Sequence, residues 1–217
     1  EQLGSDNVKM RNYIYSLIDF TEVQSILDIG CGNGYDLLQI AKLTQKNARL
    51  VGIDKSTKKI DEAREVTQND SRFSFLVHDV FSKLPFKNKN FDVVFSKDLL
   101  ECIIDKEHLI KEVHRILHPN GKVVFAHLDW DSQVIDGQDK KLVRKIVHMF
   151  GDWKQKWMKD CDSWMGRRLW GTFNRTGLFK GNIYPYVLTN TKFCAPYYGY
   201  ERIKDSLFDH SPFWFSL

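Results

Sequence analysis

The sequence predicts an α/β fold with a doubly wound, mostly parallel sheet, and three observations carry this prediction. Short, continuous apolar runs alternate with segments of helical periodicity, as in strands that are covered on both faces. The first run passes directly into a glycine-rich turn and the start of a helix. The second and third runs are each followed by an acidic residue, which gathers carboxylates at one edge of the sheet.

The predicted elements follow the chain in alternating order. The apolar runs predict strands at 25–29, 49–53, 73–77, 91–96 and 122–127. Apolar residues at helical spacing predict helices at 7–20, 35–43, 58–67 and 105–117. The segment His118-Pro119-Asn120-Gly121 has turn composition and separates the last of these helices from the strand that follows.

The sequence changes character after residue 130. Residues 131–182 are expected to be helical or irregular and carry four tryptophans, so we interpret them as an aromatic-rich lid insertion. Strands are expected at 183–190 and 213–217, with a helix at 200–209 between them, which brings the predicted sheet to seven strands. The whole chain, 1–217, is interpreted as one domain, in which 1–24 form an N-terminal helical segment and 25–130 the core.

Composition excludes several classes of protein. With 42% hydrophobic and 28% charged residues the chain is typical of a soluble globular protein. No apolar run is long enough for a membrane span, and the first residues do not resemble a secretion signal, so we expect a cytoplasmic protein without a membrane partner. The net charge of +4 is mild, and the sequence contains no block of like charges, so a nucleic-acid partner is not expected.

Cysteine usage points to reduced thiols. Cys31, Cys102, Cys161 and Cys194 form no C-x-x-C pair and no zinc spacing, and no metal site is expected. Cysteine nucleophiles are the alternative, and Cys31 stands against it because this residue lies inside the glycine-rich turn.

The most informative stretch is Ile26-Leu27-Asp28-Ile29-Gly30-Cys31-Gly32-Asn33-Gly34. Glycine is needed where the backbone takes a positive φ or approaches a ligand closely, so a strand, this turn and a helix predict a nucleotide-cofactor site. Asp28 limits which cofactor can bind, because its carboxylate would repel the pyrophosphate of a dinucleotide. It suits a cation such as S-adenosylmethionine, which carries an ammonium and a sulfonium group.

This stretch resembles motif I of the class I (Rossmann-like) S-adenosylmethionine-dependent methyltransferases of the small-molecule type, with G-x-G-x-G in place of the dinucleotide G-x-G-x-x-G. Phe91-Asp92-Val93-Val94 and Leu117-His118-Pro119-Asn120-Gly121-Lys122 also match the family's pattern. The resemblance covers roughly residues 10–130. It implies the Rossmann-like methyltransferase fold with an antiparallel seventh strand, S-adenosylmethionine as methyl donor and S-adenosylhomocysteine as product.

The cofactor residues follow from the strand ends and from the resemblance. Asp54, with Lys55 beside it, ends the second strand, where an acid accepts the ribose hydroxyls. Asp79, with Val80, matches the family's adenine-binding position, and a helix-capping role is the alternative. The expected set is Tyr13, Asp28, Gly30, Cys31, Gly32, Asp54, Lys55, Asp79, Val80, Ser96 and Lys97, with Tyr13 or Arg11 reaching the methionine carboxylate from the N-terminal helix.

The acceptor is expected beyond the ends of the fourth and fifth strands. Asp129 and His127 are the candidate catalytic bases, with a core histidine as the alternative for His127. The candidate acceptor-binding residues are Asp98, Glu101, Trp130, Trp164 and Arg167, where aromatic faces with acids suit an amine and arginine suits a carboxylate. Burial of the tryptophans and an internal ion pair of the arginine are the alternatives.

The predicted function is methyl transfer to a nitrogen or oxygen of a small-molecule acceptor, such as an amine or aromatic compound. Three alternatives stay open: an RNA or protein methyltransferase, a module that binds S-adenosylmethionine without catalysis, and a nicotinamide oxidoreductase, which Asp28 and the glycine spacing disfavour. Amino-group methylases of adenine and glutamine carry the signature Asn-Pro-Pro-Tyr after the fourth strand. This chain has Ser96-Lys97-Asp98-Leu99 there, which argues against an RNA or protein methyltransferase. We expect a monomer or a homodimer.

Overall fold

The computed structural model of the chain describes residues 3–152, 154, 158 and 160–204. Its contacts divide the chain into two compact units. The larger unit covers residues 18–182 and contains the sheet. The smaller unit combines residues 1–17 with residues 183–217. The two units are described separately, and the single domain over 1–217 stays an expectation.

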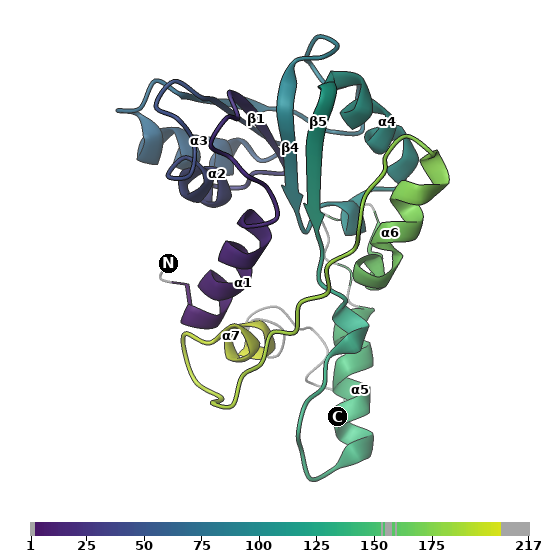
Figure 1. Cartoon of the computed structure of the whole chain (residues 1–217). Helices are drawn as coiled ribbons and strands as arrows, with labels where there is room; N and C mark the ends of the chain where they lie inside the picture. The colour runs from purple at the N-terminus through teal and green to yellow at the C-terminus, as the bar shows by residue number, and fades with distance from the viewer. Residues whose placement is uncertain (1–2, 153, 155–157, 159, 205–217) are drawn as a thin grey trace. The chain divides into compact units, whose positions relative to one another are not determined.

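The larger unit is built on a five-stranded parallel sheet in the order β3-β2-β1-β4-β5 (Figure 1). The strands are β1 (Ser25–Ile29), β2 (Arg49–Asp54), β3 (Phe73–Val77), β4 (Phe91–Lys97) and β5 (Leu117–Ala126). They confirm the five strands predicted from apolar runs, within a few residues at the ends. The central β1 is buried along its whole length, because strands flank it and helices cover it.

Three helices connect these strands, and each connects parallel neighbours as predicted (Figure 1). They are α2 (Tyr35–Ile40), α3 (Thr57–Thr67) and α4 (Lys106–Ile116). Side-chain caps begin two of them: the Ser56 hydroxyl accepts from the amide of Lys59 at 3.4 Å, and the Asp105 carboxylate from that of His108 at 2.9 Å. The periodic apolar residues of α4 are the buried ones, and they join the core beneath β4 and β5.

The predicted turn at residues 118–121 lies within β5. Leu117 pairs with Phe91, and Lys122 pairs with Val93. Between these two pairs the chain moves on by five residues in β5 but by only two in β4. The extra residues form an irregularity in which Asn120 takes a φ of 67°, a conformation that asparagine tolerates better than most residues. The residues with turn composition therefore form an irregularity inside a strand rather than a turn between two elements.

The insertion after residue 130 is helical, as predicted. It holds the short 3-10 helix η2 (Trp130–Ser132), α5 (Lys140–Gly151) and α6 (Met165–Thr176). Met165 of α6 is fully buried in the core cluster that includes Leu109 and Val113 of α4, and the Phe173 ring lies 5.2 Å from that of Phe125 on β5. Helix α6 therefore belongs to the helical layer on the sheet, and a lid formed by the insertion stays a prediction.

The predicted strand at 183–190 is wrong, because these residues form no strand in the structure. Pro185 lacks a backbone donor, and the side chains of Ile183, Tyr184 and Val187 are exposed, so this segment has no buried face to hold it against a sheet. The predicted strand at 213–217 lies outside the described residues. With it, the seven-stranded sheet is confirmed only for its five parallel strands.

The smaller unit holds α1 (Ser5–Tyr15) and α7 (Tyr198–Lys204), which confirm the predicted N-terminal helix and the described part of the helix at 200–209. The Asp6 carboxylate joins them by accepting from Asn190 at 2.6 Å and from the amide of Tyr198 at 2.9 Å.

None of the helices in the described part of the chain has the length and apolar character needed to cross a membrane.

Candidate active site

The glycine-rich turn follows β1 at the carboxyl edge of the sheet. Gly30, Gly32 and Gly34 have φ values of 76°, 52° and 78°, a region that other residues rarely adopt. The amides of Gly30 and Cys31 both donate to the carbonyl of Ile53 on β2, at 2.8 and 3.0 Å. A Cβ built on Gly32 would meet no atom within 4 Å, so this part of the turn faces open space that a ligand can enter.

Asp54 lies directly beside this turn. Its carboxylate accepts from the Gly32 amide at 3.0 Å and from the Ser56 amide at 2.9 Å. Two bonds leave lone pairs on both oxygens, and Asp54 is partly exposed, so the carboxylate can accept ribose hydroxyls as well. The structure thus brings together two features that lie 22 residues apart in the sequence.

Asp79 and Val80 follow the next strand at the same edge, because the amide of His78 bonds to the carbonyl of Asp54 at 2.9 Å. Asp79 accepts from the amide of Phe81 at 3.1 Å in a local turn, and Val80 is buried in the core cluster. Asp28 lies within β1 and is 2% exposed. Lys55 follows Asp54 and is exposed.

These residues fit S-adenosylmethionine. The turn offers open space and positive-φ glycines, Asp54 offers a partly exposed carboxylate, and Asp79 stands one strand further on. The predicted cofactor residues from the core therefore gather along the ends of β1, β2, β3 and β4. Tyr13 and Arg11 lie in the smaller unit, where the Tyr13 ring is 5.1 Å from that of Tyr186, and their role at the cofactor stays a prediction.

The end of β4 carries a compact polar cluster. The Ser96 hydroxyl is buried and donates to the carbonyl of Ile29 at 2.7 Å, which ties β4 to β1 just before the glycine-rich turn. Lys97 forms an ion pair with the adjacent Asp98, and Asp98 also accepts from the amide of Leu128 at 3.3 Å. Burial alone would raise the pKa of Asp98, but the Lys97 ammonium, the His127 ring and the bond from the Leu128 amide together outweigh burial and keep the pKa below its ordinary value.

Asp98 is held in an unusual backbone conformation, with a φ of 55°. A non-glycine residue in this region carries about 1 kcal/mol of strain, which the ion pair and the bond to Leu128 offset. Such strain is concentrated at functional sites.

Glu101 is the most perturbed carboxyl group at this edge. It lies in the 3-10 helix η1 (Leu100–Cys102), is 7% exposed, and accepts a hydrogen bond of 2.6 Å from the indole Nε1 of Trp130. Burial raises its pKa from 4.5 to about 7, and the negative charge of Asp98 adds to this, while the indole donor lowers it. A carboxyl group that titrates near neutrality can exchange a proton at physiological pH.

His127 is neutral at physiological pH. Burial lowers its pKa from 6.5 to about 4, against the opposing effect of Asp98. Its Nε2 accepts from the amide of Leu100 at 2.8 Å, so the ring proton is on Nδ1, which is buried and has no partner within the described residues. The nitrogen that would serve as a base is therefore already occupied, and this geometry favours a role in holding η1 against β5.

Asp129 is held by Arg167 rather than facing an open site. Its carboxylate accepts from the Arg167 guanidinium at 2.7 and 2.5 Å and from the Arg167 amide at 2.9 Å. Burial raises the pKa of Asp129, but its bonds with Arg167 and Ser132 outweigh this and lower it. A carboxylate with a lowered pKa is a weak base, so the geometry favours a structural pair over catalysis by Asp129 or acceptor binding by Arg167.

Trp164 is half exposed at the start of α6. Its indole donates to Asp131 at 2.9 Å, and the guanidinium of Arg167 lies 4.7 Å from the ring centroid. Asp131 also bonds His148 of α5 at 2.9 Å. The sequence had no signal for these links, because their partners are separated by 17 and 33 positions.

Three of the four cysteines are poor nucleophiles. Burial raises the pKa of the Cys31 thiol strongly, that of Cys102 to about 12, and that of Cys161 above its ordinary value. All four cysteines are free thiols.

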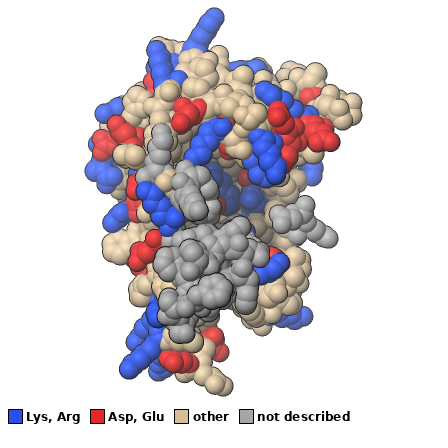
Figure 2. All heavy atoms as spheres, turned by 180° about the vertical axis from the view of Figure 1, so that it is seen from behind, with Lys and Arg blue, Asp and Glu red and all other residues tan. Residues whose placement is uncertain are grey.

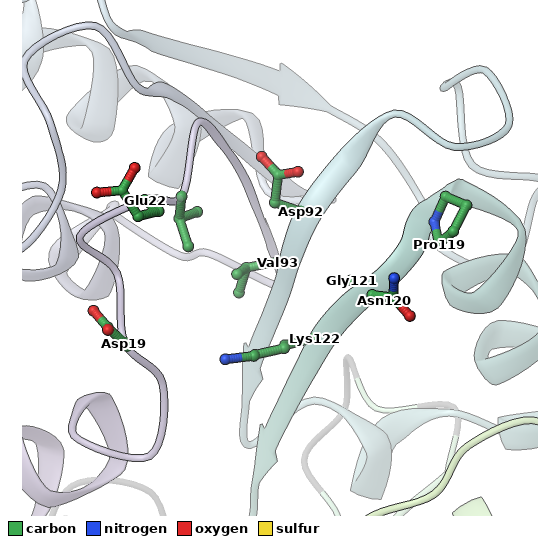
Figure 3. Close-up of a pocket in the computed structure, with 9 residues that line it drawn as sticks. Asp19, Glu22, Asp92, Val93, Pro119, Asn120, Gly121 and Lys122 are labelled. Carbon is green, nitrogen blue, oxygen red and sulfur yellow. The ribbon is translucent and has the colours of Figure 1, made fainter.

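A cavity of about 270 Å³ lies at the opposite, amino-terminal edge of the sheet (Figure 3). Asp92 lines it, but its carboxylate is engaged by the amides of Gln24 and Ser25 and by the Ser25 hydroxyl, at 2.8–3.1 Å, which links the starts of β1 and β4. Lys122 extends from β5 toward the loop that carries Asp19 (Figure 3). Asp92 thus has a structural role, and the cavity is separate from the cofactor edge.

Comparison with known proteins identifies a family for the chain. The family described as "Methyltransferase domain" matches residues 21–191. The 27-O-demethylrifamycin SV methyltransferase of Amycolatopsis mediterranei is 33% identical over 104 residues, 46% of this chain and 37% of that protein. The norajmaline N-methyltransferase of Rauvolfia serpentina is 30% identical over 131 residues, 57% of this chain and 44% of that protein. The chain thus spans less than half the length of these relatives.

The fold has solved counterparts. A chain in the complex between the Haloferax volcanii Trm112 methyltransferase activator and a methyltransferase superposes with a TM-score of 0.66 at 22% identity, over 87% of this chain and 78% of that one.

The parallel sheet and the glycine-rich turn with Asp54 define a Rossmann-like domain of the class I methyltransferase type. The match over residues 21–191 adds the family: this chain belongs to the methyltransferase-domain family.

Proposed function

We propose that this chain transfers the methyl group of S-adenosylmethionine to a nitrogen or oxygen of a small-molecule acceptor, an amine or a hydroxylated aromatic compound. The observation that carries the proposal is the position of Glu101. It is a buried carboxyl group with a near-neutral pKa, after β4, at the same sheet edge as the cofactor turn after β1.

The chain's residues would divide the work between the two substrates. The cofactor supplies an electrophilic methyl group on a sulfonium. The glycine-rich turn, Asp54 and Asp79 would hold it in place, and much of the acceleration comes from such positioning. Glu101 would take the proton that the acceptor nitrogen or oxygen loses as its new bond to carbon forms. Trp130 would orient the Glu101 carboxylate through the 2.6 Å hydrogen bond.

Glu101 is better placed for this task than the two bases predicted from the sequence. The pKa of Glu101 is about 7, so its ionised and neutral forms are both populated at physiological pH. The pKa of His127 is about 4, and that of Asp129 is below its ordinary value. A base is most effective when its pKa is close to the working pH. The names of the two relatives, an O-methyltransferase and an N-methyltransferase, support the class of acceptor atom.

On the face seen in Figure 2, Lys and Arg are interspersed with Asp and Glu and do not form one continuous stripe. A stripe of cations that follows a phosphate backbone is the usual footprint of an RNA-modifying enzyme. The face seen in Figure 2 lacks this footprint, and the net charge of +4 is mild, which agrees with a small acceptor.

The decisive experiment incubates the protein with methyl-labelled S-adenosylmethionine and separate pools of small amines, phenols, carboxylates, RNA and lysate proteins, with mass detection. We expect label in a small amine or phenol, and we expect Glu101→Gln to lose most of that activity while it still binds the cofactor. Label confined to RNA or protein, or cofactor binding without label in any pool, would overturn the proposal. Glu65→Gln, an exposed residue of α3, is the matched control and should label the same acceptor.

A further inference from the structure

Helix α5 has a charge distribution that the methyl-transfer site does not explain. Its twelve residues, Lys140–Gly151, include the cations Lys140, Lys141, Arg144 and Lys145 and no aspartate or glutamate. All four cations are exposed, and none forms an ion pair with a carboxylate among the described residues. The nearest acid, Asp139, caps the helix by accepting from the amides of Lys141 and Leu142 at 2.8 and 3.0 Å.

Apolar side chains lie beside these cations on the surface. Leu142 is 46% exposed and Met149 is 43% exposed. They are seven residues apart, so they lie two turns apart on nearly the same line of the helix, next to Lys145. Val134, in the loop before α5, is 99% exposed. Isolated exposed apolar residues are common, but here Leu142 and Met149 lie directly beside the row formed by Lys141 and Lys145.

The other face of α5 fixes the helix to the larger unit. Val147 is buried, the Phe150 ring lies 5.2 Å from that of Trp130, and His148 bonds Asp131 at 2.9 Å. These contacts lie in the C-terminal half of the helix. The N-terminal half, with the four cations, is therefore the exposed end (Figure 1, α5).

We propose that α5 is a docking surface for an anionic lipid membrane, with the four cations on the headgroups and Leu142, Met149 and Val134 in the interfacial layer. A basic helix with an apolar flank is typical of segments that lie in the plane of a membrane surface. The helix is about 18 Å long, so it can lie flat on the headgroups without crossing the bilayer. This departs from the expectation of no membrane partner, which concerned a spanning segment.

The apolar flank is what favours a membrane over other anionic partners. Nucleic acid binds cations through phosphates and offers no apolar layer for Leu142 and Met149. An acidic protein surface would pair with the cations, but it would gain little from the exposed apolar side chains of Leu142 and Met149. The proposal does not depend on the proposed acceptor or on Glu101.

The test is sedimentation of the whole protein with vesicles. We expect binding to vesicles of phosphatidylglycerol mixed with phosphatidylcholine, little binding to phosphatidylcholine alone, and release when the salt concentration is raised. The variant K140E/K141E/R144E/K145E should bind the anionic vesicles about tenfold or more weakly, because each cation near such a surface contributes separately. Leu142→Ser with Met149→Ser should weaken the binding that persists at high salt.

The matched control reverses four exposed lysines elsewhere in the larger unit, K46E/K58E/K87E/K111E, which makes the same change in net charge. This control should bind much more tightly than the α5 variant. Equal loss in both variants would mean that only net charge matters, and the proposal would fail. It would also fail if the protein bound RNA or an acidic peptide but no anionic vesicle. Circular dichroism and cofactor binding would show that each variant is folded.

Discussion

The indole Nε1 of Trp130 donates a 2.6 Å hydrogen bond to Oε2 of Glu101, and this bond joins η2 after β5 to η1 after β4. Most of the remaining environment of Glu101 disfavours its charge. Burial is the main cause, and Asp98 and Asp162 add negative charge nearby. The bond from Trp130 is the largest influence that favours the ionised form, ahead of the Lys97 ammonium, and it helps to set the pH at which Glu101 exchanges a proton.

The pKa of Glu101 should appear in the stability of the protein. The folded pKa of about 7 is above the ordinary 4.5, so the folded state binds an extra proton between these values. Its contribution is therefore full below pH 4.5 and is lost as the pH rises through 7, with a size of about 3 kcal/mol. Glu101→Gln lacks this loss and should be more stable than wild type at pH 8 but not at pH 4.5. Urea unfolding measures both, and an equal difference at the two pH values would contradict the prediction.

Trp130→Phe should move the titration of Glu101 upward. Phenylalanine keeps an aromatic ring against Phe150 but has no donor for Oε2, so the ionised carboxylate loses its hydrogen bond. The pH at which stability is lost should then rise by about one unit. The effect should disappear in the double variant with Glu101→Gln. A shift that persists in the double variant would assign the titration to another group.

Asp129 and Arg167 should behave as one structural pair. Asp129→Asn and Arg167→Met should each lower the free energy of unfolding only modestly, because Arg167 is exposed and water screens the pair, and the double variant should cost little more than either. The cofactor affinity should not change. Asp61→Asn, which loses the exposed contact to Arg64, is the control and should have almost no effect. If Asp129 were a catalytic base, Asp129→Asn would lose turnover with no loss of stability.

The centre of the sheet was predictable because its strands are short apolar runs that are largely buried. β1 is buried along its whole length and β4 along most of it, and no helical pattern competes with their apolar residues. The segment at 183–190 carries β-favouring residues such as Ile183, Tyr184 and Val187, and the prediction failed there because propensity does not supply a neighbouring strand or a buried face.

The cofactor side of the site was predictable for a related reason. Parallel strands end at one edge, so residues that follow β1 and β2 must meet there, and Asp54 does bond to Gly32. The acceptor side has no such rule. Glu101 and Trp130 are 29 positions apart, and Asp129 and Arg167 are 38 apart, in connections whose course depends on the packing of α6. A side chain's partner decides its chemistry there, and the partner is visible only in the structure.

Asp54 should contribute strongly to cofactor binding. Asp54→Ala removes the acceptor for the two ribose hydroxyls and also the partner of the Gly32 amide, so the affinity for S-adenosylmethionine should fall about 30-fold, or ~2 kcal/mol. Isothermal titration calorimetry measures it directly. Asp61→Ala on the surface of α3 is the control and should bind like wild type. Unchanged affinity in Asp54→Ala would remove this residue from the cofactor site.

Gly32 allows a test that separates backbone strain from ligand contact. Gly32 and Gly177 both have positive φ, 52° and 63°, and a Cβ at either would meet no atom within 4 Å. Alanine at either position should therefore lower the free energy of unfolding by a similar amount, about 1–2 kcal/mol, from backbone strain alone. Only Gly32 faces the space assigned to the cofactor, so Gly32→Ala should also weaken S-adenosylmethionine binding, by about tenfold or more, since the added methyl occupies ligand space. Thermal unfolding and calorimetry on both variants measure the two effects. Equal cofactor affinity in Gly32→Ala and Gly177→Ala would show that the open space over Gly32 does not hold the ligand.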